Sequence, residues 1–230
     1  HMLDDPVEAF AARELGVPLL TPATPDGPMV LEGGAIDVNG DGCLLTTEEC
    51  LLSPVQARNP HLSQDQVERM LCGYLGVQKI LWLRNGIVGD DTHGHVDDLA
   101  RFVDAGTIVV AQEKDPADAN YQLLEENLAI LRGMIDRRGQ PFRIVPLPMP
   151  RPVIFDGIRL PASYANFYIA NRYVLVPVFN DPADRVGLHT MAEWFPDREV
   201  TGIYAGDLVW GLGTLHCLTQ QQPVGKISLG

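Results

Sequence analysis

The residues best suited to chemistry lie near the C-terminus, where residues 210–223 read WGLGTLHCLTQQQP. Cys217 follows a glycine-rich approach and precedes a polar run, a setting typical of a nucleophile. Residues 89–98 read GDDTHGHVDD and hold two histidines and four carboxylates within ten positions. A thiol can attack a substrate while imidazoles and carboxylates move protons and orient it. The two segments together predict a cysteine-dependent enzyme.

Each candidate also has a purely structural explanation when it is taken alone. A cysteine is often a small buried hydrophobic residue. His95 is equally explained as a strand-end histidine bonded to backbone, and Asp97 with Asp98 as a solvated turn or a helix cap. Glu32 is equally explained as the end of a strand near a bulge. The choice therefore depends on the motifs as a set.

Two further motifs complete that set, LEGG at residues 31–34 and LLTTEECLL at residues 44–52. With the two segments above, from about Asp5 to Gln222, they resemble the agmatine deiminase family, which is related to the bacterial peptidylarginine deiminases. The resemblance implies hydrolysis of agmatine to N-carbamoylputrescine and ammonia, a step toward putrescine, without a metal or an organic cofactor. Peptidylarginine deimination, which citrullinates proteins, is the close alternative.

Four residues match the catalytic positions of the family, namely Cys217, His95, Asp97 and Glu32. The resemblance implies that the thiolate of Cys217 attacks the guanidinium carbon, that ammonia leaves, and that water opens a covalent thiouronium intermediate. His95 would serve as acid and base, while Glu32 and Asp97 would also bind the guanidinium N–H groups. Further candidate substrate contacts are Gly211, Gly213 and Asn166.

One family motif has no match in this sequence. The family carries a Trp-x-Arg-Asp motif ahead of its Glu-Gly-Gly element, and the aspartate helps to hold the guanidinium. The chain opens with His1-Met2, which resembles a cloning scar. We therefore expect residues 3–230 to form the C-terminal part of a single catalytic domain. Because one guanidinium anchor is missing, we expect little or no turnover from this chain alone.

The composition limits the partners. The formal net charge is −13, which argues against binding to nucleic acid or anionic lipid and favours a cationic small-molecule substrate. No apolar run reaches the roughly 18 residues needed to cross a bilayer, so no membrane partner is expected. The absence of a C-x-x-C spacing argues against a zinc site or a disulfide framework and favours the cytoplasm. The cysteines expected in the core are Cys43, Cys50 and Cys72.

A rival motif predicts a different class of protein. Residues 37–48, DVNGDGCLLTTE, match the loop of a calcium-binding EF-hand. The flanking sequence contradicts a helix on each side, and residues 39–42, NGDG, are equally a strong hairpin turn. Calcium binding at this loop, or a purely binding or assembly role, are the alternatives to an enzyme.

A pattern of two strands, a helix and a strand recurs three times, over residues 29–83, 95–147 and 166–204. In the first repeat a hairpin over residues 31–52 turns at residues 39–42, and a helix begins at a capping box and ends at Gly76. In the second, strands at 95–103 and 107–112 precede a helix and a strand at 142–147. In the third, strands at 166–170 and 173–179 precede a short helix at 186–194 and a strand at 200–204.

Some local expectations are more specific. The capping box pairs Ser63 with Gln66. The helix of the second repeat extends to Ile135 and stops at Gly139. A strand at 215–220 opens a fourth repeat, and residues 6–20 form a helix stopped by Gly16 and then a short strand. The helical face of the second repeat carries Leu124, Leu128, Leu131 and Ile135.

The predicted class is α/β (α+β), built from ββαβ repeats. The resemblance implies a pentein, a five-bladed α/β propeller, of which this chain supplies about three full blades. Repeats around one axis place the starts of their first strands at one mouth. Glu32, His95, Asp97, Asn166 and Cys217 occupy such starts. Edges left uncovered by absent blades favour a homodimer.

Overall fold

The computed structural model describes residues 7–24 and 26–222. The described residues fall into two compact units, residues 7–24 and 26–30 with 221–222, and residues 31–220. In the smaller unit the predicted helix is confirmed, because α1 (Val7–Leu15) ends where Gly16 adopts a φ of 64°. The strand expected by residue 20 is wrong. A later pair, β1 (Ala23–Thr24) and β2 (Gly27–Pro28), forms instead.

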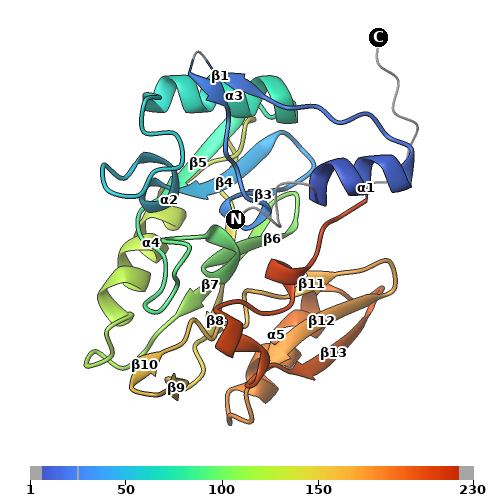
Figure 1. The fold of residues 1–230 in the computed structure, drawn as a ribbon. Helices are drawn as coiled ribbons and strands as arrows, with labels where there is room; N and C mark the ends of the chain where they lie inside the picture. The colour runs from blue at the N-terminus through green and yellow to red at the C-terminus, as the bar shows by residue number, and fades with distance from the viewer. Residues whose placement is uncertain (1–6, 25, 223–230) are drawn as a thin grey trace. The chain divides into compact units, whose positions relative to one another are not determined.

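The larger unit contains the three predicted ββαβ repeats, each with a three-stranded sheet (Figure 1). The first sheet consists of β3 (Asp37–Val38), β4 (Cys43–Thr47) and β5 (Lys79–Leu83). The second consists of β6 (Ala100–Asp104), β7 (Thr107–Gln112) and β8 (Arg143–Pro148). The third consists of β11 (Tyr168–Ile169), β12 (Tyr173–Val178) and β13 (Glu199–Tyr204). In every sheet the first two strands are antiparallel and the last two are parallel.

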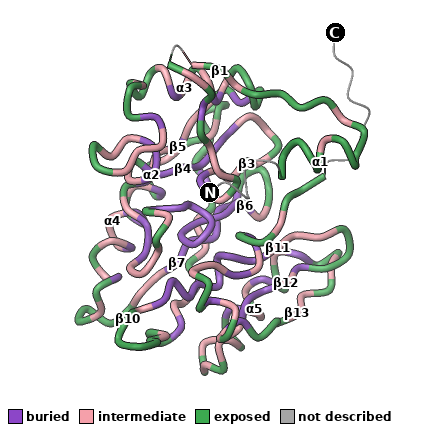
Figure 2. The backbone as a smooth tube through the Cα atoms, in the orientation of Figure 1, coloured by how far each residue is buried: buried purple, intermediate pink, exposed green. Residues whose placement is uncertain are grey.

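The hydrophobic core joins each sheet to the next. Leu45 and Leu81 of the first sheet pack in one cluster with Ile108 and Val110 of the second. A second cluster joins β7 and β8 to β12, around the buried aromatic residues Tyr164 and Phe167 and the helix α5 (Asp184–Trp194). Figure 2 shows the buried backbone running through β4, β6 and β7. The repeats therefore share their cores.

The helices of the first and second repeats begin and bury side chains as the sequence predicts. The helix α3 (Gln64–Leu75) begins at the predicted Ser63–Gln66 capping box and ends at Gly76, whose φ is 68°. The helix α4 (Tyr121–Gly133) buries Leu124, Leu128 and Leu131, as predicted.

The predicted extension of α4 to Ile135 is wrong. The chain becomes extended at Met134, and Ile135 forms a β-bridge with Pro141. Gly139 belongs to the turn between these two bridge residues, where it adopts a φ of 81°. The apolar spacing typical of a helix therefore continues in the sequence to Ile135, although the helix itself ends at Gly133 and Ile135 pairs with Pro141.

Three segments expected to be strands are single turns of 3-10 helix. These turns are η1 (Gly33–Ala35), η2 (Val96–Asp98) and η4 (His216–Leu218). The predicted strand at 215–220 is therefore wrong, and the first strands of the repeats begin later than expected. The candidate site residues lie in or beside the segments that precede those strands. The hairpin predicted over residues 31–52 is confirmed only between β3 and β4, because a helix, α2 (Glu48–Leu52), follows directly.

One hairpin was not predicted. Strands β9 (Ile154–Phe155) and β10 (Ile158–Arg159) pair across Asp156 and Gly157, whose φ values are 49° and 76°. Asp-Gly is a strong signal for such a turn, so the sequence contained the information. A last 3-10 turn, η3 (Leu208–Gly211), precedes the cysteine segment.

An EF-hand at residues 37–48 is contradicted by the fold. These residues themselves contain the paired strands β3 and β4, and only the single 3-10 turn η1 precedes them, whereas an EF-hand loop lies between two α-helices. Asn39 uses its side-chain oxygen to accept hydrogen bonds from the backbone N–H groups of Asp41 and Cys43. Asp41 binds Arg137 and Arg138. The segment is a hairpin turn whose polar atoms are occupied by the protein.

No helix in the described residues is long and apolar enough to cross a membrane.

A buried arginine ties the three sheets together. Arg101 on β6 donates from Nε to Asp37 Oδ1 on β3 at 2.7 Å. Its Nη1 donates to the carbonyl of Phe167, which lies just before β11, and its guanidinium lies over the ring of Phe167. Asp37 also accepts from the backbone N–H of Phe102. Because Arg101 and Asp37 are both largely buried, each compensates the charge of the other.

We expect Asp37→Asn to lower the free energy of unfolding by about 3–5 kcal/mol, because it leaves the Arg101 guanidinium buried without its charge partner. The matched control is Asp197→Asn, which breaks the exposed Asp197–Arg198 pair and should cost less than about 1 kcal/mol. Urea denaturation of both variants measures the difference. An equal loss of unfolding free energy in the two variants would contradict the structural role of the buried Arg101–Asp37 pair.

Candidate active site

The Glu-Gly-Gly element places Glu32 beside His95. Glu32 lies just before η1 and accepts a hydrogen bond on Oε1 from Arg58 Nε at 2.8 Å. Its other oxygen, Oε2, lies 3.9 Å from His95 Nε2. A Cβ atom at Gly34 would lie 2.5 Å from His95 Nδ1 and 2.9 Å from Asp97 Oδ2. Glycine at position 34 is therefore what lets His95 and Asp97 pack directly against the backbone of the Glu-Gly-Gly element.

The histidine loop is organised by a carboxylate of its own. Asp90 accepts hydrogen bonds from the backbone N–H groups of Thr92, Gly94 and His95. The carbonyl of Gly94 accepts from the Thr47 hydroxyl at 2.6 Å, which ties this loop to the end of β4. Asp90 therefore holds the backbone that presents His95.

Asp97 is the centre of the site. It is fully buried, and its Oδ2 lies 2.7 Å from His216 Nδ1 and 3.4 Å from Cys217 Sγ. His216 is itself buried, and sequence reasoning treated it only as a neighbour of the cysteine. Its position directly before Cys217 is the signal that could have identified it. The pair Asp97 and His216 links the histidine loop to the cysteine segment.

Asn166 fixes the cysteine segment from the other side. Its Nδ2 donates to Cys217 Sγ at 3.1 Å. Its Oδ1 accepts from the Thr214 hydroxyl and from the backbone N–H groups of His216 and Cys217. Asn166 is fully buried, so these bonds hold the thiol in one place. Its predicted contact with substrate stays a prediction.

The two predicted glycines differ in what they permit. A Cβ atom at Gly213 would lie 2.9 Å from Cys217 Cβ and 3.1 Å from its sulfur, so only glycine lets the chain fold back onto the cysteine. A Cβ atom at Gly211 would meet nothing within 4 Å. Between them Leu212 adopts a φ of 65°. Gly213 therefore has a steric role in placing the thiol.

The charges around Glu32 and His95 reinforce one another. Burial alone would raise the pKa of Glu32, but the contacts with His95 and Arg58 lower it to about 2. Burial alone would lower the pKa of His95, but the contacts with Cys50 and Glu32, with the charge of Asp97, raise it to about 10. At neutral pH Glu32 is an anion and His95 carries a proton that it can donate.

The pKa values of Asp97 and Asp98 are shifted in opposite directions. Burial tends to raise the pKa of Asp97, but His216 outweighs it and keeps the pKa of Asp97 low. For Asp98, burial together with the charge of Asp97 outweighs the opposing effects of His95 and Asn166 and raises its pKa. Desolvation of the sulfur, with the negative charges of Asp98 and Asp97, raises the pKa of Cys217. The resting cysteine is therefore a thiol held in a negative field.

Several buried polar atoms of the site lack hydrogen-bond partners in the described part of the chain. They are Glu32 Oε2, His95 Nε2, Asp97 Oδ1 and Asp98 Oδ1. Buried polar groups are normally paired, so a group of unpaired ones marks a place prepared for a ligand. Glu32 and Asp97 have lowered pKa values, and an ionised carboxylate only accepts hydrogen bonds, so their unpaired oxygens require donors from a ligand.

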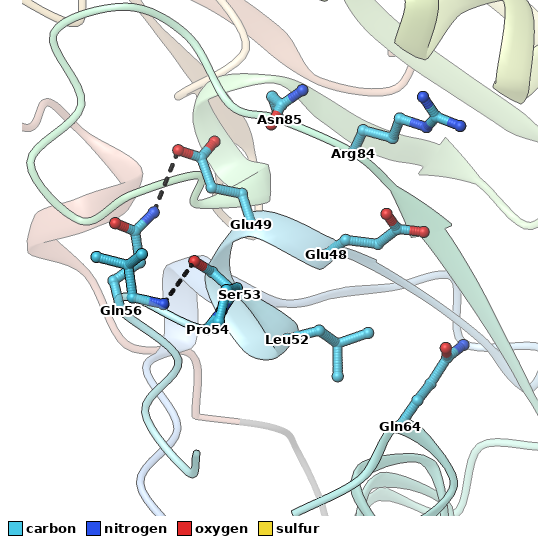
Figure 3. A pocket seen from close by; sticks show the side chains of 10 residues that line it. Glu48, Glu49, Leu52, Ser53, Pro54, Gln56, Gln64, Arg84 and Asn85 are labelled. Atoms are coloured by element: carbon cyan, nitrogen blue, oxygen red, sulfur yellow. Dashed lines mark hydrogen bonds between the residues drawn. The ribbon is translucent and has the colours of Figure 1, made fainter.

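A separate surface pocket of about 680 Å³ lies beside α2 and contains none of these residues. Figure 3 shows Glu49 in this pocket, accepting a hydrogen bond from Gln56. The other carboxylate oxygen of Glu49 accepts from the backbone N–H of Gly86, and the carbonyl of Gln56 accepts from Arg58. This pocket therefore borders the segment that positions Arg58 on Glu32.

The comparison with known proteins decides the family. A model of the Porphyromonas-type peptidyl-arginine deiminases matches residues 1–223. The chain belongs to this family. A Legionella pneumophila relative named "Putative agmatine deiminase" is 43% identical over 197 residues, covering 85% of this chain and 56% of the relative. The chain thus spans about half the length of the curated relatives that it matches.

Solved structures of deiminases have the same fold. The agmatine deiminase of Enterococcus faecalis is 35% identical, with a TM-score of 0.88 over 96% of this chain and 63% of that chain. An agmatine deiminase from C. jejuni is 32% identical, with a TM-score of 0.80 over 94% of this chain and 61% of that chain. The predicted α+β fold of the deiminase type is therefore confirmed for this peptidyl-arginine deiminase family member.

We expect Gly34→Ala to lower the melting temperature by about 2–12 °C, because its methyl group would push on His95 and Asp97 and overpacking costs about 1–3 kcal/mol. The neighbouring Gly33→Ala is the matched control, since its Cβ meets only Gln220 at 3.8 Å. Differential scanning calorimetry measures both variants. A Gly34→Ala protein as stable as Gly33→Ala would contradict the close packing of the site.

Proposed function

We propose that the protein hydrolyses the guanidinium group of a cationic small molecule, with agmatine as the preferred substrate. The observation that carries the proposal is the position of Cys217 Sγ, 3.1 Å from Asn166 and 3.4 Å from Asp97. This thiol lies in a group of carboxylates whose buried oxygens lack donors. A guanidinium offers a planar set of N–H donors and a positive charge, which is what such a site requires.

The carboxylates bind and orient the substrate in this proposal. Asp97 Oδ1 and Glu32 Oε2 accept guanidinium N–H groups, and the low pKa values of both residues keep them ionised. Two acceptors fixed on different turns hold the plane of the guanidinium against the sulfur. Asp98 lies beside Asp97 and Cys217, and burial together with the charge of Asp97 raises its pKa.

Proton transfers by His95 complete the chemistry. The sulfur of Cys217 forms a bond to the guanidinium carbon, and the C–N bond breaks as His95 gives its proton to the departing ammonia. Neutral His95 then removes a proton from a water molecule that attacks the thiouronium carbon. The C–S bond breaks, the remaining proton of the water oxygen passes to solvent as the neutral ureido product leaves, and the thiolate is restored. The raised pKa of His95 suits its first role as an acid.

Activation of the thiol follows from the same electrostatics. In the free site Asp97 and Asp98 oppose ionisation of Cys217. A bound guanidinium brings a positive charge next to the sulfur and offsets the carboxylates, so the thiol releases its proton to solvent and the thiolate becomes favourable when the substrate arrives. When no guanidinium is bound, neutral electrophiles encounter Cys217 in its less reactive thiol form. This arrangement ties reactivity to the charge of the substrate.

Two substrate classes agree with the family. Agmatine is supported by the names of the curated relatives and of two solved structures, and peptidylarginine by the name of the family model. The negative charge of the protein, −13, favours a small cation with a second amine, such as agmatine. We propose agmatine first and peptidylarginine second. We also propose that residues 3–230 supply only part of the catalytic domain and turn over slowly by themselves.

We expect Cys217→Ser and Cys217→Ala to lose at least about a thousandfold in turnover of agmatine, because the covalent step requires the thiolate. Formation of N-carbamoylputrescine is measured with this chain and with any longer natural form that contains it. The control is Cys72→Ser, which removes a thiol from α3 and should stay within about twofold of the parent.

Free arginine and a peptidylarginine are measured in parallel with agmatine. Faster turnover of the peptide than of agmatine would reverse the order of the two substrate classes. A longer natural form that is inactive on all three substrates, or an active Cys217→Ala variant, would overturn the proposed reaction.

A further inference from the structure

A second cysteine adjoins the proposed acid and base. Cys50 is buried in α2, whose first turn is fixed by the Thr47 hydroxyl accepting from the Cys50 backbone N–H at 3.1 Å. The sulfur of Cys50, a ring nitrogen of His95 and a carboxylate oxygen of Glu32 all lie within 4.8 Å of one another. Sequence reasoning assigned Cys50 to the core, and it is buried there. It did not anticipate the contact with the site.

The atoms that face one another in this group are not satisfied by the protein. Glu32 Oε2 and His95 Nε2 are buried and lack hydrogen-bond partners in the described residues. They lie 3.9 Å apart, too far for a hydrogen bond between them. The side chain of His95 is 7% exposed, so water does not readily replace the missing partner.

The spacing is close to that of metal ligands. A tetrahedral ion bound at about 2.0–2.3 Å holds adjacent ligand atoms about 3.3–3.8 Å apart. The distances between the three observed atoms, all within 4.8 Å, therefore need to shorten by about 1.5 Å at most. Glu32 can supply this movement, because its side chain is 39% exposed and only its Oε1 is held by Arg58.

We propose that Glu32, Cys50 and His95 form a zinc site that holds the enzyme inactive when the ion is bound. A thiolate, an imidazole and a carboxylate are ligands that zinc accepts, whereas calcium and magnesium prefer oxygen atoms alone. Binding forms three metal–ligand bonds and releases the thiol proton and any imidazole proton to solvent, with no change of oxidation state. A water molecule or a further side chain would complete four ligands.

The inhibitory effect rests on the proposed function, whereas the binding of the metal does not. A zinc ion on His95 removes the acid that protonates ammonia, and one on Glu32 removes an acceptor for the guanidinium. Substrate and metal therefore compete for the same two side chains. Excess agmatine should weaken inhibition by zinc in proportion to its saturation of the site.

A competing cluster requires a control. Asp97, Asp98 and Cys217 also offer atoms within 4.8 Å of one another. The binding experiment therefore uses a Cys217→Ser background, which removes the other thiol of the site. Cobalt(II) replaces zinc as the probe, because a thiolate ligand gives a charge-transfer absorption that oxygen and nitrogen ligands do not.

Cobalt(II) is titrated into the Cys217→Ser protein while the near-ultraviolet and visible absorption is recorded. We expect a thiolate charge-transfer band that saturates at one ion per chain and that zinc abolishes by displacement. Adding Cys50→Ser or Cys50→Ala should remove the band and weaken binding at least about tenfold. Adding Cys72→Ser should leave both unchanged. Circular dichroism confirms that each variant is folded, and the two replacements of Cys50 guard against misfolding of either.

Absence of the band in the Cys217→Ser protein, or its persistence without Cys50, would overturn the zinc site. Either result is compatible with a parent protein, with Cys217 in place, that turns over agmatine, so it would leave the deiminase proposal intact. Conversely, a Cys50-dependent band together with a parent protein that has no deiminase activity would support the metal site and remove its inhibitory meaning.

Discussion

The candidate site depends on one buried carboxylate, Asp97. An ionised aspartate with no exposed surface is costly unless it is paired, and His216 provides the pairing at 2.7 Å. The same oxygen lies 3.4 Å from the sulfur of Cys217, so the carboxylate also sets the electrostatic field of the thiol. Gly34 supplies the space for it, since a side chain there would collide with its Oδ2. The three segments of the site therefore meet around Asp97.

The scaffold brings these segments together through Arg101. Asp97 lies four residues before Arg101, and Asn166, which holds the cysteine segment, lies directly before Phe167. Arg101 binds the Phe167 carbonyl and pairs with Asp37 on the first sheet. A single buried guanidinium thus connects the histidine segment, the asparagine segment and the sheet that follows Glu32. The repeated ββαβ topology gives each segment its place, and this clamp fixes their distances.

The sequence predicted features that depend on local chemistry. The capping box at Ser63, the left-handed glycine at position 76 and the alternation of strands and helices are local, and the structure has them. The family motifs identified Cys217, His95, Asp97 and Glu32, which the structure places in one unit. The sequence did not predict the 3-10 turns around these residues, because a single turn has no periodicity to detect. It missed the end of α4 because a bridge to Pro141, rather than a helix breaker, ends the helical pattern.

The contacts made across the fold were the hardest to predict. Arg58 and Cys50 have ordinary sequence surroundings, and their importance comes from what lies beside them in space. Arg58 lowers the pKa of Glu32 from a segment 26 positions away along the chain. The prediction that Cys50 is a core residue is correct, since it is buried, but its sulfur also lies within 4.8 Å of a ring nitrogen of His95. Such roles need the tertiary structure, since neither burial nor residue type distinguishes them.

The central claim is that Cys217 is held as a thiol by its anionic surroundings and becomes reactive when a planar cation binds. The most direct test compares alkylation of Cys217 by chloroacetamidine, a cation, with alkylation by its neutral isostere chloroacetamide, using peptide mass spectrometry to follow the modified residue. The account predicts that the cation reacts at least about tenfold faster, beyond the ratio measured for a free thiol such as glutathione, and that this preference falls in Asp97→Asn. Equal rates for both reagents after that correction, or an unchanged preference in Asp97→Asn, would contradict it.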